Sequence, residues 1–181
     1  MVALLRGVNV GGRTRLAMAD LRAAAEECGY EHVRTYIQSG NVVFAAPSSD
    51  TSAVATRIRR VLAHRTGLDP EIVVRTSQEL RAVVEANPYV RRGEDPAHLH
   101  VVFTDGDAQA SLGSIDLAAR APDEAAAAGQ HLYLFLPSGL GRSKLVADLA
   151  RQKGPPGTIR NWRTVTKLSA MAEETAGTTD G

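Results

Sequence analysis

A glycine-rich loop near the N-terminus carries residue types that bind anions. It spans residues 6–14 (RGVNVGGRT) and follows a short apolar segment at residues 2–5. Its spacing is that of a phosphate-binding P-loop, with Arg13 in place of the usual lysine. The helix of a P-loop begins at this basic residue, whereas the apolar helical stripe of this chain starts only at Met18. We therefore expect anion binding here, but not the fold of a P-loop nucleotide hydrolase.

A predicted hairpin turn supplies further polar groups for the same site. Residues 33–37 and 42–46 are rich in β-branched and aromatic types, and Gly40 between them tolerates the positive φ of a turn. In an antiparallel sheet of strand order four-one-three-two, the end of the first strand lies beside the start of the third. The glycine loop and the turn are therefore expected to meet. This first candidate site comprises Arg6, Asn9, Gly11, Gly12, Arg13, Gln38, Ser39 and Asn41, with Arg15 nearby.

The C-terminal part of the chain is the most positively charged. Seven Lys and Arg residues and one acidic residue fall within residues 142–167. Ser143 is a good N-cap for a helix whose first turn carries Lys144. Trp162 has an arginine two residues before it and another directly after it, an arrangement that could stack a base against a cationic rim. This second candidate site comprises Ser143, Lys144, Arg160, Asn161, Trp162 and Lys167.

Three functions remain open on these residues. The first is binding of a phosphorylated small molecule or nucleotide by the two candidate sites, acting separately or as one. The second is a single-stranded nucleic-acid-binding module that uses the 142–167 face, although RNA-recognition sheets need several aromatic residues and this chain has 4%. The third is a scaffold or interaction domain in which the same motifs only fix turns and helix docking.

Chemistry beyond binding is not specified by the sequence. His98 and His100 lie two apart on a predicted strand, but no further ligand at zinc spacing completes a set, so no metal site is predicted. Ser39 and Ser143 have no base placed beside them in the sequence, so no nucleophile is assigned. The catalytic residues, any cofactor and the question of whether the protein is an enzyme stay open.

The elements that must position these residues fall into two similar halves. Residues 2–76 read as strand, helix, strand, strand, helix, strand, the pattern of a ferredoxin-like (split βαβ, α/β-plait) unit. A second, similar half follows, with predicted elements at 98–104 (strand), 108–120 (helix), 125–129 and 131–136 (hairpin), from 143 (helix) and after 161 (helix). The predicted fold is α+β: a tandem of two ferredoxin-like units with antiparallel sheets and a C-terminal helix.

We predict four parts along the chain: 1–76 as unit one, 77–96 as a connecting helix and linker, 97–175 as unit two with the C-terminal helix, and 176–181 as a flexible tail. Fraying is expected from Thr175 onward, since the sequence there is small and polar.

The composition is that of a globular protein. The 181 residues are 44% hydrophobic and 23% charged, with a formal net charge of +1. The net charge therefore gives no indication of a nucleic-acid or membrane partner. The single cysteine, Cys28, cannot form an intramolecular disulfide, which favours a reducing compartment and hence the cytoplasm. No apolar run approaches the roughly 20 residues of a membrane span, so no membrane partner is expected.

The quoted motifs resemble a bacterial family, the domain of unknown function 1697 (DUF1697). The resemblance rests on residues 4–12, 18–22, 35–44, 87–89, 141–145 and 160–168. It implies two similar α/β-plait units in one chain and no assigned reaction. The family commonly has a lysine after the two glycines, so Arg13 keeps the positive charge and changes its geometry.

Overall fold

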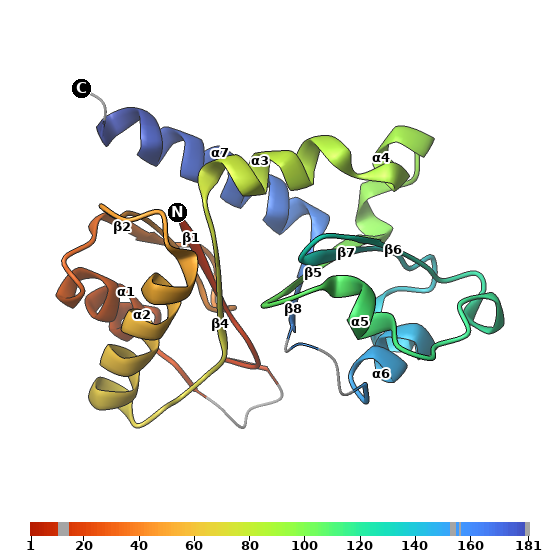
Figure 1. The fold of residues 1–181 in the computed structure, drawn as a ribbon, viewed down its shortest axis with the longest axis horizontal. Helices are drawn as coiled ribbons and strands as arrows, with labels where there is room; N and C mark the ends of the chain where they lie inside the picture. The colour runs from red at the N-terminus through yellow and green to blue at the C-terminus, as the bar shows by residue number, and fades with distance from the viewer. Residues whose placement is uncertain (11–14, 153–154, 156, 180–181) are drawn as a thin grey trace. The chain divides into compact units, whose positions relative to one another are not determined.

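A computed structural model describes residues 1–10, 15–152, 155 and 157–179. In this part of the chain, eight strands form two four-stranded antiparallel sheets with the orders β2-β3-β1-β4 and β6-β7-β5-β8 (Figure 1). The strands are β1 (Val2–Leu5), β2 (Glu31–Thr35), β3 (Asn41–Ala45), β4 (Ile72–Arg75), β5 (Leu99–Thr104), β6 (Glu124–Ala128), β7 (His131–Phe135) and β8 (Gly157–Asn161). The helices are α1 (Met18–Glu27), α2 (Thr51–Thr66), α3 (Ser77–Ala86), α4 (Pro88–Arg92), α5 (Ala108–Leu112), α6 (Lys144–Leu149) and α7 (Trp162–Thr179).

The first sheet has the predicted order, with β1 in its interior. Ala3 lies opposite Val42 on one side and Val74 on the other, and these three residues share the face that packs on α1 and α2. Leu21 of α1 and Ile58 of α2 are fully buried in this core. Asp50 caps the start of α2, because its carboxylate accepts a hydrogen bond from the Ala53 amide at 3.0 Å. Strands β1, β3 and β4 carry apolar residues at consecutive positions and are buried along most of their length, so alternation does not mark the face that carries the helices.

The second sheet repeats this strand order with shorter helices. The helix expected over 108–120 is wrong in length: α5 ends at Leu112, because Gly113 follows with φ 51°, and a separate 3₁₀ turn covers Ala118–Arg120. Strand β8 was not predicted by the sequence analysis. It is held by pairing with β5, with Val101 opposite Arg160, and its sequence GTIRN carries only one large apolar residue.

The C-terminal segment is helical where fraying was expected. Helix α7 runs to Thr179, and Thr175 is buried, donating a hydrogen bond from its hydroxyl to the Met171 carbonyl at 2.9 Å. The Arg34 guanidinium of β2 also donates to Thr175 Oγ1 at 3.1 Å. A polar sequence is therefore ordered here by packing and side-chain hydrogen bonds, which propensity does not report.

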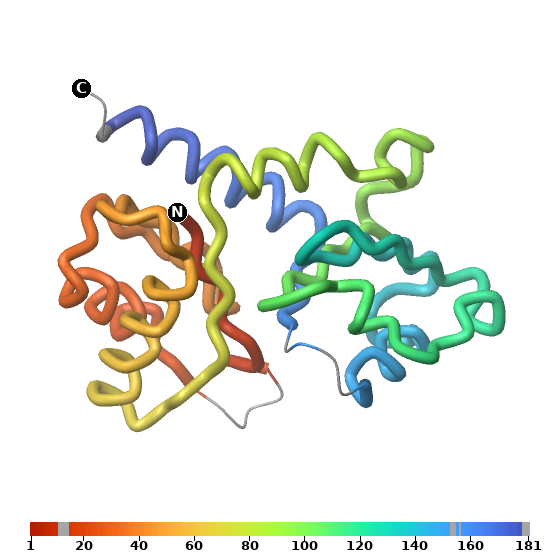
Figure 2. The backbone as a smooth tube through the Cα atoms, in the orientation of Figure 1, coloured from red at the N-terminus to blue at the C-terminus, as the bar shows by residue number. Residues whose placement is uncertain are grey.

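By the density of contacts, the chain forms two compact units. Unit 1 comprises Met1–Val83 together with the segment from Lys167 onward, and unit 2 comprises Val84–Thr166. Figure 2 traces the chain through them, from the red N-terminal strand to the blue C-terminal helix. Helices α3 and α7 each begin in one unit and end in the other. The residues of the first candidate site all belong to unit 1.

Gly40 is predicted to be the least replaceable residue of the hairpin turn. Its φ is +71°, and an added Cβ would meet Val8 Cγ2 and would lie 2.8 Å from Leu5 Cβ. Gly40→Ala should therefore cost about 2 to 5 kcal/mol, from the positive φ together with overpacking. Gly67→Ala is the matched control, since Gly67 has φ +72° with nothing within 4 Å; it should cost about 1 to 2 kcal/mol. Urea unfolding measures both, and equal losses would show that the approach at Gly40 is not tight.

Candidate functional site

The glycine loop and the hairpin turn meet, as the sheet order predicted. The amide of Leu5, the last residue of β1, donates to the Gly40 carbonyl at 2.9 Å. Further along the loop, Asn9 Nδ2 donates to the Gln38 carbonyl at 2.8 Å. The end of β1 is therefore bound to the turn before β3 through two contacts, one from the backbone and one from a side chain.

A single side-chain amide joins three segments at this point. Asn9 Nδ2 also donates to the Leu16 carbonyl at 2.8 Å, and Asn9 Oδ1 accepts from the Leu16 amide at 2.9 Å. Asn9 has φ +56°, a conformation that Asn adopts more readily than most residues. We name the resulting arrangement the Asn9 junction. It comprises residues 6–10, 15–16 and 36–40.

Several predicted ligand contacts have structural roles in the junction. Asn9 has both donor and acceptor atoms engaged, so it positions the loops. Asn41 is fully buried, and its Nδ2 donates to Ser39 Oγ at 2.9 Å and to the Tyr36 carbonyl at 3.1 Å. These two bonds hold the turn in place, so the Asn41 amide faces the protein and not a ligand. The predicted residues Gly11, Gly12 and Arg13 lie outside the described residues.

Two arginines and a glutamine of the junction are exposed. The side chains of Arg6, Arg15 and Gln38 make no hydrogen bond or ion pair with any residue that the structure describes. The Arg6 amide donates to the Glu71 carbonyl at 2.9 Å, and this contact fixes the backbone from which its guanidinium extends. The Glu71 carboxylate itself lies 3.7 Å from Arg59. The junction thus presents cations that the fold has not neutralised.

Two exposed aliphatic residues at the junction were missed by the sequence analysis. Val10 is 68% exposed and Ile37 is 50% exposed. Each is the chain neighbour of a residue in the Asn9–Gln38 hydrogen bond. Their residue types do not predict exposure, because Val and Ile in strand-like segments are normally buried.

Some residues of the second candidate site have structural roles. Ser143 is buried and its Oγ accepts from the Val146 amide at 3.0 Å, which confirms it as the N-cap of α6. Asn161 caps α7 in the same way, its Oδ1 accepting from the Thr164 amide at 2.8 Å. Lys144 and Lys167 are exposed. Two of the predicted binding residues therefore serve as helix caps.

Arg160 and Trp162 are buried, contrary to their expected role in a stacking platform. Trp162 is 7% exposed, so its ring offers no open face. Arg160 is 8% exposed, and its Nη1 donates to Thr158 Oγ1 at 2.6 Å and to the Ile159 carbonyl at 2.8 Å. Burial lowers the pKa of Arg160 to about 10. Arg160 is therefore hydrogen-bonded to its own strand, and Trp162 is buried.

Arg75 in the first half has the same local environment as Arg160. Its Nη1 donates to the Val74 carbonyl at 2.8 Å, and Thr76 caps α3 by accepting from the Glu79 amide at 3.1 Å. Both arginines are buried near the end of the last strand of a sheet, next to the residue that caps the following helix. The repeated arrangement favours a structural role for this arginine in each half.

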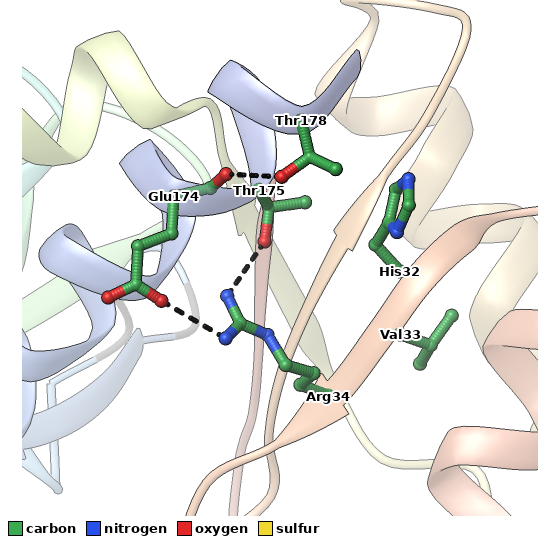
Figure 3. A pocket seen from close by; sticks show the side chains of 6 residues that line it. All are labelled: His32, Val33, Arg34, Glu174, Thr175 and Thr178. Atoms are coloured by element: carbon green, nitrogen blue, oxygen red, sulfur yellow. Dashed lines mark hydrogen bonds and ion pairs between the residues drawn. The ribbon is translucent and has the colours of Figure 1, made fainter. Parts of the chain in front are cut away.

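A cavity of about 400 Å³ lies between β2 and the end of α7, within unit 1 (Figure 3). Arg34 crosses it: Nη1 donates to Glu174 Oε2 at 3.1 Å, and Nη2 donates to Thr175 Oγ1 and to the Met171 carbonyl. Arg34 thus links β2 to the end of α7 through hydrogen bonds. None of the residues predicted for binding lines this cavity.

The motif at residues 87–89 also serves the fold. Asn87 Oδ1 accepts from the Tyr89 amide at 3.0 Å and caps α4. The Tyr89 ring lies 6.0 Å from that of Phe135, and Arg92 lies over both rings while binding Glu124 through two hydrogen bonds. Burial raises the pKa of Tyr89 to about 12, so its hydroxyl stays neutral.

His98 and His100 lie in different local environments. His98 ends the 3₁₀ helix Pro96–His98 and contacts the Phe135 ring edge-on, while His100 is buried in β5. In the part of the chain that the structure describes, no group of three or more His, Cys, Asp or Glu residues could hold a metal ion. No described helix is both long and apolar enough to span a bilayer.

Comparison with known proteins identifies relatives without an assigned activity. A family model described as "Protein of unknown function (DUF1697)" matches residues 1–133, and no curated protein matches the chain. Among solved structures, conserved bacterial protein SP0830 from Streptococcus pneumoniae is similar, with a TM-score of 0.74 and 25% identity over 94% of this chain and 97% of that chain. The resemblance inferred from the motifs is thereby confirmed, although residues 141–145 and 160–168 lie beyond the matched range.

Removal of the Asn9 amide is predicted to destabilise unit 1. Asn9→Ala should cost about 3 kcal/mol, since three hydrogen bonds of about 1 kcal/mol each are lost, and the positive φ adds to that. Asn9→Gly keeps the backbone conformation accessible and isolates the contribution of the amide. Asn9→Asp keeps the acceptor for Leu16 and loses both donors. Urea unfolding ranks the variants, and wild-type stability in all three would disprove this role.

Acid is predicted to destabilise the protein through His100. Burial lowers the pKa of His100 below its ordinary 6.5, and its Nδ1 has no hydrogen-bond partner among the described residues. Below about pH 6.5 the unfolded chain therefore binds a proton that the folded chain does not. The free energy of unfolding consequently decreases as the pH is lowered through this range, and the full contribution of His100 to stability is retained above it.

His100→Gln should flatten this dependence by up to about 1.4 kcal/mol per pH unit, the value for one proton. The measurement is the free energy of unfolding in urea between pH 5 and pH 8, with the exposed His64→Gln as control. An unchanged pH slope in His100→Gln would contradict the assignment.

Proposed function

We propose that this chain, which belongs to the DUF1697 family of proteins of unknown function, binds a phosphorylated small molecule at the Asn9 junction. One observation carries the proposal. The Asn9 amide fixes three segments together, and the exposed side chains of Arg6 and Arg15 that extend from them have no partner among the described residues. Guanidinium groups on a fixed backbone bind phosphate oxygens through pairs of charged hydrogen bonds.

The local charge supports an anionic ligand. No acidic residue occurs in the chain before Asp20. Glu71 contacts Arg6 through its backbone carbonyl, and the Glu71 carboxylate lies 3.7 Å from Arg59. An arginine without an acidic neighbour keeps its full attraction for an anion. Gln38 adds an amide that donates and accepts hydrogen bonds, as the hydroxyl and carbonyl groups of a small metabolite require.

The burial of Arg160 and Trp162 disfavours the nucleic-acid alternative. A single-strand platform needs exposed rings beside exposed cations, and in the 142–167 stretch the tryptophan is 7% exposed. Arg160 is 8% exposed. The exposed cations of this stretch, among them Arg142, Lys144, Arg163 and Lys167, then lack Trp162 as a stacking surface, so we favour a phosphorylated small molecule.

The finer features of the fold are part of this proposal. We infer that each half is a ferredoxin-like unit, a proposal supported by the identical strand order and by the strand-helix sequence of both halves. The predicted division into 1–76, 77–96, 97–175 and 176–181 follows from the same scheme. A cytoplasmic location is expected as well, since Cys28 is free and buried.

Titration of arginine variants tests the proposed site. We expect inorganic phosphate, ribose 5-phosphate or a nucleoside monophosphate to bind in isothermal titration calorimetry, and Arg6→Gln or Arg15→Gln to weaken that binding about 10- to 100-fold. This range corresponds to one charged hydrogen bond of about 1.5 to 3 kcal/mol. Arg22→Gln is the matched control, because Arg22 is exposed on α1 outside the junction.

The dependence of affinity on salt concentration distinguishes a small phosphate compound from a single-stranded nucleic acid. A small phosphate compound should show a shallow dependence of affinity on salt, whereas a single strand that contacts many phosphates loses affinity steeply. Equal effects of Arg6→Gln and Arg22→Gln, or the absence of binding by every phosphate compound in the panel, would overturn the proposed function.

A further inference from the structure

The Asn9 junction combines its cations with an apolar surface. Val10 and Ile37 are 68% and 50% exposed, more than the other exposed large hydrophobic residues of the described chain, Val90 and Leu140. They come from different segments, which the Asn9–Gln38 hydrogen bond of 2.8 Å holds together. Each is one residue, about 3.8 Å along the chain, from that bond. The two residues therefore flank the hydrogen bond that joins the loop to the turn.

Ile37 occupies a conformation that does not suit its residue type. Its φ is +48°, where a β-branched side chain is strained and where Asn or Gly would fit better. The neighbouring backbone keeps it there: the Tyr36 amide donates to the Asn41 carbonyl at 3.0 Å, and the Gln38 carbonyl accepts from Asn9. An exposed isoleucine at this position contributes neither burial nor favourable backbone energy to the fold. What it does contribute is exposed apolar surface, on a turn that the Asn9–Gln38 hydrogen bond joins to the loop that carries Arg6.

We infer that the ligand of the junction is a nucleotide, whose phosphate binds Arg6 and Arg15 and whose base lies on Val10 and Ile37. This inference rests on the proposed function and names the class of its ligand. The charge complementarity requires an anionic group, and the aliphatic pair requires an apolar part next to it. A base has flat apolar faces with polar edges, and the free Gln38 amide can hydrogen-bond such an edge.

Other phosphate compounds match only part of this surface. A sugar phosphate satisfies the arginines but leaves both aliphatic side chains in contact with water. An inorganic phosphate does the same and offers nothing to Gln38. A nucleotide places a charged group and a flat ring with apolar faces within one molecule. The apolar surface thus discriminates between ligands that the arginines alone would accept.

The test compares three probes on the full-length protein: adenosine 5′-monophosphate, ribose 5-phosphate and adenosine. We expect adenosine 5′-monophosphate to bind at least 10-fold more tightly than either of the others in calorimetric titration. Ile37→Asn should reduce its affinity to about that of ribose 5-phosphate and leave the ribose 5-phosphate affinity unchanged. Arg6→Gln should weaken both phosphate compounds. Uridine and guanosine 5′-monophosphates in the same titration report base preference.

The variants are chosen so that folding does not confound the result. Asn tolerates positive φ, so Ile37→Asn should keep or raise the melting temperature. Val10→Thr preserves shape and removes apolar character, and Val90→Thr on α4 is its matched control at a residue 42% exposed. We expect Val10→Thr to weaken adenosine 5′-monophosphate several-fold and Val90→Thr to have no effect.

The outcomes separate this inference from the proposed function. Equal affinities for adenosine 5′-monophosphate and ribose 5-phosphate, unaffected by Ile37→Asn, would overturn the inference and leave the phosphate site standing. Failure of all phosphate compounds to bind would overturn both. If Ile37→Asn changed the oligomeric state in light scattering and left nucleotide affinity intact, the apolar pair would be a protein contact, and the inference would be wrong.

Discussion

The position of β1 inside its sheet is the constraint on which the candidate site depends. The strand pairs with β3 on one side and β4 on the other, and all four of its residues are buried. Because β3 runs antiparallel beside it, the chain leaving β1 emerges next to the turn that precedes β3. The Leu5–Gly40 hydrogen bond marks this point. Any loop that follows β1 must therefore pack on the hairpin turn, whatever its own sequence.

The Asn9 amide converts this proximity into a defined surface. Two loops that merely meet would sample many arrangements, and their side chains would hold a ligand at a large entropic cost. Three hydrogen bonds from one side chain fix residues 6–10 against both Leu16 and the turn. These hydrogen bonds stabilise the conformation of the loop and are not available for contacts with a ligand. Arg6 and Ile37 then extend from backbone that is already in place before a ligand arrives.

Much of this arrangement was predictable from local patterns, and the rest depended on tertiary pairing. The order of strands and helices predicted over residues 2–76 indicated the strand order, and with it the meeting of loop and turn. Strand β8 escaped prediction because its pairing with β5, and not its sequence, makes it a strand. The exposure of Ile37 had no sequence signal, since its type predicts burial and only the turn geometry turns it outward.

Charge in the sequence and charge on the surface are different quantities in this protein. The 142–167 stretch is the most basic part of the chain, yet Arg160 is buried, with a pKa lowered to about 10 that still leaves it charged at neutral pH. A buried cation satisfies hydrogen bonds of its own fold and is not available to attract a ligand. Arg6 lies in a stretch with fewer cations, but its charge faces water. Burial therefore withdraws Arg160 from the surface of this basic stretch, whereas Arg6 and Arg15, on which the proposed site rests, are both exposed.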